Sequence, residues 1–540
     1  MDDLLAAPAE TAGGLAVHGA RAVDGSTPAS TRQALVDADV PGRLAAQNPP
    51  LWDLRTAAGR PGSGAGLLPR LAELAAELAD LDHVVLLGTG GSPLASQALA
   101  RTTGHPLTVL DTTDPGRVRA TLEDRLTRTV VVLIGSAEVT PEVDSIRRAY
   151  RRAFLDAGLS EAEAGRHLVV VTEPGSPLAA ATAEWSAITV PADAPVGGRS
   201  SALSTYGLVP CALAGVPVAD LLDQADAFAA SLPRPQDNPA LALGAALAAA
   251  ATSGRDTVAL VGDGTGVEGL GDWVEHLLAG STGKDGQGVL PVVVESPDGP
   301  GLTGPDVLTV SYGGALAAGA VPVGGVTPDV AVNGPLGAHF LAWEYAAAVA
   351  ATVLGVDPSD RPDTAESARH TEAILADPPP VPTPSSTTGV IEVYAPSGTP
   401  DDLPDALRHL LAGLGDHGYL AVTAYLDPHA EAAAARLRPL LAALTRRPVT
   451  FGWGPRYLHS TGQYHKGGPQ VGSFLQITGT VKVDLPVPGK PYTFGELQAA
   501  QAAGDRRALA GRGRPMLHLH LTERSAGLTR LIDAVGSLRA

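Results

Sequence analysis

The sequence predicts an α/β protein with two α/β/α sandwich lobes, mainly parallel sheets, and a smaller C-terminal α/β domain. Short, continuous runs of apolar β-branched residues alternate with helical patterns along most of the chain. Such runs are typical of parallel strands that are covered by helices on both faces of a sheet. A strand, a Gly-rich loop and a helix also follow one another twice, at 84–99 and 257–278. This repetition predicts two related lobes.

The chain divides by composition into five segments. Residues 1–40 lack sustained periodicity and predict a flexible N-terminal segment, and the Pro-rich stretch 377–389 predicts a linker. Between them we expect a first lobe over 41–230 and a second over 231–376, with a C-terminal α/β domain over 390–540. The expected strands after the first Gly-rich motif are 107–111, 129–135 and 167–172, and those of the C-terminal domain are near 391–394, 419–425, 473–478 and 516–521.

Charge and composition exclude several classes of function. The formal charge of −19 gives no electrostatic footprint for nucleic acid and disfavours contact with anionic membranes. The single Cys211 rules out a disulfide within the chain, and the apolar run near 239–252 is too short to span a bilayer. The acidic N-terminus does not have the pattern of a signal peptide. We therefore expect a soluble, cytoplasmic protein that binds a small molecule.

The first Gly-rich loop is a candidate anion site. Gly88, Gly90, Gly91 and Ser92 follow a buried strand and open a helix, where backbone N–H groups attract anions. A plain tight turn is the alternative, because Pro93 stands at the helix start and no ribose-binding acid is evident.

A second Gly-rich segment, 195–207, carries a basic side chain. Gly198 exposes the backbone next to Arg199, and hydroxyl groups follow. An arginine in this setting suits an oxyanion, a carboxylate or a phosphate, whereas the alternative is a structural salt bridge.

Two further patterns near the C-terminus contain histidine. His465 and Lys466 precede two glycines and offer a cationic loop for an anion, or a structural turn. His518 and His520 point to one face of a predicted strand, but no third residue has the spacing of a metal ligand, so a surface strand is the better interpretation.

Several motifs together resemble the phosphoglucose isomerase family, over about residues 40–530. The segment 272–293 resembles the family signature WVEQLxAESTGKxGKGxLP, and 86–95 and 196–208 resemble its GxGGSxL and VGGRYSxxSxxGL motifs. The segment 354–362 also fits the family pattern, and 454–478 is similar to the end of actinobacterial isomerases and transaldolase–isomerase fusions. The resemblance implies two sugar-isomerase (SIS) type lobes.

The resemblance also implies a reaction: aldose–ketose isomerisation of a sugar phosphate, of the glucose 6-phosphate and fructose 6-phosphate type, through a cis-enediolate. It implies no metal or organic cofactor, and a homodimer in which active sites borrow residues from the partner. By position, Arg199 would stabilise the enediolate and His459 would open the sugar ring. The substrate-binding residues by the same match are Gly90, Gly91, Ser92, Thr140, Gly198, Ser281, Thr282, Lys284, Gln463 and Lys466.

Two departures separate this chain from the family pattern. Gly280 stands where the family has its proton-transferring glutamate, and a general base is typically worth ~10²–10⁴-fold in rate. At 134–145 the family has a phosphate clamp, SSKSGGTVETDS; here Ser136 replaces its lysine, and Glu138 and Val139 replace its glycines. A carboxylate repels a phosphate.

These departures leave two functional hypotheses. In the first, the chain is an isomerase in which His276, four residues before Gly280 on the same helical face, acts as the base; an ordinary helix histidine is the alternative. In the second, the chain is a repurposed paralogue that acts on a different polyhydroxylated or carboxylated ligand, with or without a phosphate, or a sugar-binding protein without catalysis.

Overall fold

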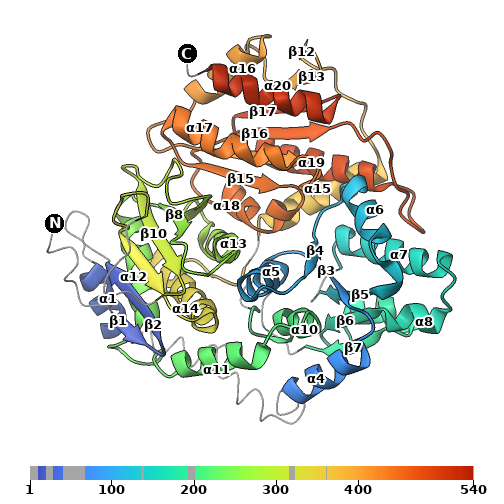
Figure 1. Ribbon diagram of the computed structural model, residues 1–540. Coiled ribbons are helices and arrows are strands. Elements are labelled where there is room, and N and C mark those ends of the chain that lie inside the picture. The colour runs from blue at the N-terminus through green and yellow to red at the C-terminus, as the bar shows by residue number, and fades with distance from the viewer. Residues whose placement is uncertain are drawn as a thin grey trace.

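The computed structural model describes residues 10–19, 28–39, 67–135, 139–192, 201–315, 323–360 and 362–538. In this part of the chain the strands form three sheets, two with six strands and one with five. The predicted α/β class is confirmed, and Figure 1 shows helices against all three sheets.

The first sheet is parallel throughout, with strand order β4-β3-β5-β6-β7. Alternate residues of its strands enter two different cores, as in β5, where Val132 packs with α4, α5 and α10 and Val131 packs with α6 and α7. Both faces are therefore buried, as the continuous apolar runs predict. The elements are β3 (His83–Leu87), β4 (Thr108–Leu110), β5 (Thr129–Ile134), β6 (Leu168–Thr172), β7 (Ile188–Pro191), α4 (Leu67–Glu77), α5 (Gly91–Thr103), α6 (Pro115–Glu123), α7 (Pro141–Asp156), α8 (Glu161–Arg166), α9 (Pro177–Thr182) and α10 (Thr205–Leu213).

The second sheet has the order β1-β2-β11-β10-β8-β9 and is parallel from β11 to β9. The prediction that residues 1–40 form a flexible segment is wrong for β1 and β2. These two strands form a hairpin that adds to the edge of the sheet, with β2 antiparallel to β11. The edge strand β11 offered unpaired backbone groups, which the hairpin satisfies. The elements are β1 (Glu10–Ala12), β2 (Leu15–Gly19), β8 (Thr257–Gly262), β9 (Leu290–Val294), β10 (Val307–Gly313), β11 (Val330–Asn333), α1 (Pro28–Asp37), α11 (Val218–Ala229), α12 (Pro239–Thr252), α13 (Leu270–Thr282) and α14 (Leu336–Leu354).

The third sheet has the order β12-β13-β17-β16-β14-β15. The four C-terminal strands are parallel, and β12 and β13 add to the edge in antiparallel fashion. Strand β12 lies inside the range 377–389. The prediction of a linker is therefore wrong for the last residues of that range. The elements are β12 (Ser386–Thr388), β13 (Ile391–Tyr394), β14 (Tyr419–Tyr425), β15 (Val449–Trp453), β16 (Gly472–Gly479), β17 (Met516–Leu521), α15 (Thr364–Ala376), α16 (Leu403–Ala412), α17 (Leu437–Thr445), η6 (Arg456–His459), α18 (Thr461–Gly467), α19 (Phe494–Gly511) and α20 (Arg524–Ser537).

Shared cores join the three sheets. One core runs continuously between the helices of the first and second sheets, and a second core packs the outer face of β8 and β9 against β14, β16 and α18. In Figure 1 the third sheet lies across the top of the other two, and α5 and α13 lie in the middle. None of the helices in the described ranges is long and apolar enough to cross a membrane.

Helices α12 and α14 are in tight contact at Gly244, and a substitution there tests how closely they pack. A Cβ added at Gly244 would lie 2.6 Å from Cβ of Val349. We expect Gly244→Ala to destabilise the protein by about 1–2 kcal/mol, because overpacking outweighs the gain in helix propensity. A lower midpoint in urea and thermal unfolding would show this.

Gly536→Ala in α20 is the matched control. The same added Cβ meets nothing within 4 Å there, so the midpoint should stay or rise slightly. Equal loss of stability in both variants would contradict the packing explanation.

Candidate active site

The carboxyl edge of the first sheet gathers the candidate residues. The loops after β3 and β4 carry Gly90 and Asp111, and α7 begins beyond β5 with Glu142 in its first turn. Ligands of open parallel sheets bind at this edge. Two histidines from distant parts of the chain reach it: His276 on α13 and His459 at the end of η6.

His276 packs directly against the first Gly-rich loop. A Cβ at Gly90 would lie 3.4 Å from Cε1 of His276, and the backbone of Gly90 has φ 88°, in the left-handed region that favours glycine. The histidine is fully buried, which differs from the partly exposed helix histidine offered as the alternative interpretation. Gly280, one turn further along α13, is also buried. The structure therefore brings His276 to the candidate substrate loop.

Ser92 joins this loop to the described part of the Arg199 motif, which begins at Ser201. Its Oγ lies 2.5 Å from Oγ of Ser201, and both side chains are buried. Gly91 and Ser92 open α5, as predicted. Arg199, Gly198, Ser136 and Glu138 lie outside the described residues.

His459 forms a pair with Glu142. Its Nε2 lies 3.3 Å from Oε1 of Glu142, and the side chains are 24% and 5% exposed, so that the histidine is the member open to a ligand. Burial alone would raise the pKa of Glu142, but the hydrogen bond and charge of His459, with help from Thr140, hold this pKa below its usual value. An ionised carboxylate that orients an imidazole is a common arrangement in acid–base catalysis.

Three more carboxylates at this edge are paired with basic residues from the C-terminal part of the chain. Asp111 pairs with Arg456, Asp114 with Arg524 at 2.6 Å, and Asp144 with Lys490 at 2.9 Å. A phosphate at this edge must therefore compete with carboxylates for these cations.

Glu275 is a carboxyl group that sequence reasoning missed. Burial raises its pKa well above the usual range; Asp272 adds to the rise and Arg456 opposes it. Glu275 lies five residues before Gly280, and this spacing turns its side chain to a different face of α13 from that of Gly280. The nearby charge of Arg456, which no local pattern shows, places it beside the pairs at the sheet edge.

The predicted substrate residues of the 281–284 loop serve a structural joint. Oγ1 of Thr282 donates to Leu278 O at 2.7 Å and accepts from Val289 N at 2.9 Å, and Ser281 is buried. Lys284 is 2% exposed and donates to the carbonyl of Asp357. These side chains are therefore engaged within the protein, and their predicted contact with substrate stays a prediction.

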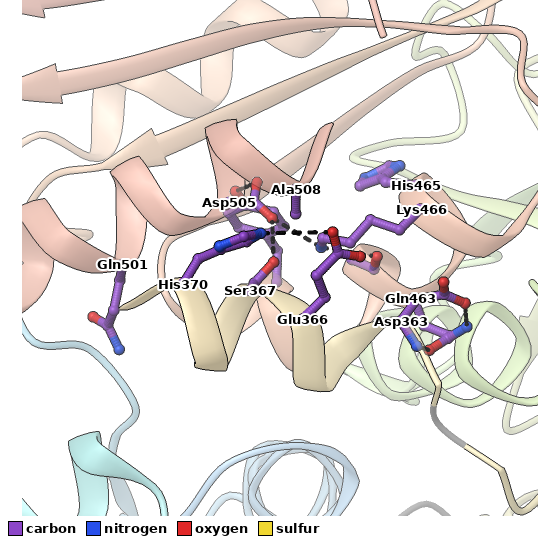
Figure 2. Close-up of polar contacts among 12 residues, drawn as sticks. Asp363, Glu366, Ser367, His370, Gln463, His465, Lys466, Gln501, Asp505 and Ala508 are labelled. Atoms are coloured by element: carbon purple, nitrogen blue, oxygen red, sulfur yellow. Dashed lines mark hydrogen bonds and ion pairs between the residues drawn. The ribbon is translucent and has the colours of Figure 1, made fainter. Parts of the chain in front are cut away.

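Gln463 belongs to the same joint. Its Nε2 donates to Gly283 O at 3.0 Å and to Oδ2 of Asp363 at 2.7 Å (Figure 2), and its side chain is buried. The joint ties α18 to the end of α13. Substrate binding by Gln463 stays a prediction, since its amide nitrogen is engaged within the protein.

Lys466 is held in a buried ion pair. Its Nζ lies 2.8 Å from Oδ1 of Asp505, with side chains 0% and 1% exposed, and Figure 2 shows the lysine pointing into the protein toward α19. Asp505 also accepts from the hydroxyls of Ser367 and Tyr457. The charge of Lys466 is thus compensated inside the protein, and its predicted contact with substrate stays a prediction.

The remaining histidines of the sequence patterns are also internal. His465 stacks on Tyr419, and burial, with the charge of Lys466, lowers its pKa to about 3, so the predicted cationic loop is not formed. His518 is buried and shares Oγ1 of Thr478 with His520, in an interior strand and not a surface one. In the described ranges, no cluster of three or more His, Cys, Asp or Glu could hold a metal ion.

The fold defines the class of protein first. The chain superposes on a crystal structure of a glucose-6-phosphate isomerase from Chlamydia trachomatis with a TM-score of 0.57, covering 70% of this chain and 91% of that one at 17% identity. The fold is thus that of the SIS-type phosphosugar isomerases.

Sequence comparison then gives the relationship. The chain is 36% identical over 225 residues to a probable glucose-6-phosphate isomerase of Haloarcula marismortui, and 41% identical over 173 residues to a glucose-6-phosphate isomerase of Thermosynechococcus vestitus. These matches cover 40% and 30% of this chain, and the chain spans 50% and 32% of the two relatives. No family model matches. Over these parts of its length the chain is similar to glucose-6-phosphate isomerases.

The buried ion pair of Lys466 gives a prediction about stability. We expect Asp505→Asn to destabilise the protein by about 3–5 kcal/mol, because it leaves a buried ammonium without its counter-charge. Chemical denaturation measures the loss. Asp156→Asn, which breaks an exposed pair with Arg152, should cost less than about 1 kcal/mol; a similarly small loss for Asp505→Asn would contradict the structural role.

The same pair sets a pH dependence. Burial would raise the pKa of Asp505, but Lys466 holds it below its usual value. The folded-state pKa is thus below the unfolded one, so this stabilisation is complete above about pH 4 and is lost as the pH falls through the folded-state pKa.

Proposed function

We propose that the chain is an aldose–ketose isomerase that acts on a sugar phosphate of the glucose 6-phosphate or fructose 6-phosphate type. The pair of His459 and Glu142 at the carboxyl edge of the first sheet carries the proposal. The names of the relatives and the fold support the same reaction class.

In the proposed reaction His459 opens the sugar ring. The protonated imidazole, whose Nε2 faces Glu142, donates its Nδ1 proton to the ring oxygen O5. The C1–O5 bond breaks and solvent water accepts the proton of the C1 hydroxyl, which gives the open-chain aldose. Glu142 holds the imidazole in its orientation and compensates the positive charge of the protonated ring. Because Glu142 is buried and His459 is partly exposed, the histidine is the member that meets the substrate.

Isomerisation then needs a base near C1 and C2, and we assign it to His276. The base removes the proton from C2, and the electrons form the cis-enediolate. The hydroxyl proton on O2 passes to O1, and the base, after exchanging its proton with solvent, protonates C1 to give the ketose. His276 stands at Gly90, on the loop that the family match assigns to substrate. Arg199, by the family match, would stabilise the enediolate. No cofactor is required, and we propose a cytoplasmic homodimer as in the resemblance.

A second candidate function is suggested by the charges at the sheet edge. Arg456, Arg524 and Lys490 are each paired with a carboxylate, and Ser136 replaces the clamp lysine. These features favour an unphosphorylated, polyhydroxylated ligand, which the chain would isomerise or only bind.

The first test measures isomerisation by the purified chain in D₂O. We expect conversion of glucose 6-phosphate to fructose 6-phosphate with solvent deuterium at C1, seen by NMR. His459→Asn should lower kcat/KM by ~10²–10⁴-fold at an unchanged thermal midpoint, because the ring-opening acid is lost. Conversion of the unphosphorylated hexose alone would favour the second candidate. If neither sugar is converted, the result would contradict an isomerase and support a sugar-binding protein without catalysis.

His276 has a separate test. We expect His276→Gln to abolish isomerisation, since glutamine has a similar size and no titratable group. Gly280→Glu in the same background restores the family carboxylate and should recover part of the rate. An unchanged rate in His276→Gln would remove this histidine as the base.

A further inference from the structure

We propose that Gln501 is a positioning residue that holds Glu142 in the orientation in which its carboxylate meets His459. The inference rests on the proposed function for its catalytic meaning, because Gln501 acts through Glu142 and does not itself reach the substrate. In this inference a side chain on α19, in the C-terminal part of the chain, sets the orientation of a carboxylate at the edge of the first sheet.

The hydrogen bonds of Gln501 fix the direction of its amide. Its Oε1 accepts from Oγ1 of Thr113 at 2.7 Å, and its Nε2 donates to Oε1 of Glu142 at 2.6 Å. A carboxylate can only accept, so the reversed amide would set two oxygens against each other. All three residues are buried, so water does not offer an alternative partner.

Gln501 and His459 meet the same oxygen of Glu142 from two sides. The histidine Nε2 lies 3.3 Å from Oε1, and the glutamine Nε2 lies 2.6 Å from it. Because the bond of Gln501 is the shorter one and comes from the interior, it sets where this oxygen stands. The imidazole, which is the partly exposed member, then aligns on a carboxylate that is already in place.

The helix that carries Gln501 is itself anchored by buried charge. Asp505, one turn further on α19, forms the ion pair with Lys466 at 2.8 Å and accepts from Ser367 at 3.1 Å. Figure 2 shows Gln501 and Asp505 on this one helix. Tyr425 adds a hydrogen bond from its hydroxyl to the carbonyl of Gln501 at 3.5 Å. A rigid helix can hold a side chain to the tolerance that a catalytic pair requires.

The test compares Gln501→Met with Gln498→Met. Gln498 lies three residues earlier on α19 and is similarly buried, and within the described residues its amide nitrogen has no partner. Both variants replace a buried amide by an apolar side chain of similar length. Only Gln501→Met removes a donor to Glu142, so a general loss of packing affects both variants alike.

The kinetic readout is the pH profile of kcat/KM. We expect Gln501→Met to move the acid limb upward by about one pH unit and to lower the neutral rate by about tenfold, since a buried carboxylate that loses a donor is harder to ionise. Gln498→Met should keep the wild-type profile. An acid limb that stays in place for Gln501→Met, or moves equally for Gln498→Met, would overturn the proposal.

A spectroscopic readout separates this inference from the proposed function. In wild type the neutral ring of His459 should carry its hydrogen on Nε2, which faces Glu142; ¹⁵N shifts of the ring, assigned with His459→Gln, report the tautomer. Gln501→Met should give mixed tautomers, as should Glu142→Gln. If wild type does not isomerise sugars but Gln501→Met still changes the tautomer, the function fails and the positioning stands. An unchanged tautomer in Gln501→Met would overturn the positioning.

Discussion

Four carboxylates at one sheet edge are paired with basic side chains from the C-terminal part of the chain, and these pairs join the third sheet to the first. Asp144 is also paired with Arg147 and Arg148 of its own helix. Asp111, Asp114, Glu142 and Asp144 gather at this edge because the first sheet is parallel, so loops after neighbouring strands meet there. Such charges in a partly buried setting need partners. The third sheet and its loops supply those partners.

This constraint explains why the third sheet sits where it does. Its inner face packs on the second sheet through apolar residues, while its loops reach the first sheet through charge. The apolar contact is non-directional, whereas each ion pair requires a particular geometry. Packing thus brings the units together, and the pairs fix how they are aligned. The candidate site lies along the charged part of this contact.

The sequence predicted the elements better than the site. Strands such as β5 and β14 are continuous apolar runs, so local pattern alone defines them. The N-terminal hairpin was missed because its strands are short and are stabilised by an edge far along the chain. Motif matching placed His276 and His459 at the sheet edge, but it also selected Lys466, whose buried partner Asp505 no spacing rule could reveal. The contact between Glu142 and Gln501 could not be predicted from the sequence either, because the two residues are 359 positions apart.

The long separations within the site have a consequence for how the protein folds. Glu142 and His459 are 317 residues apart, and Asp114 and Arg524 are 410 apart. Contacts of such high order close large loops and form late. During synthesis the first sheet can fold while its edge carboxylates remain in water, because their partners have not yet left the ribosome. We therefore expect the pairs at this sheet edge to form late in folding, after the C-terminal part of the chain has been synthesised.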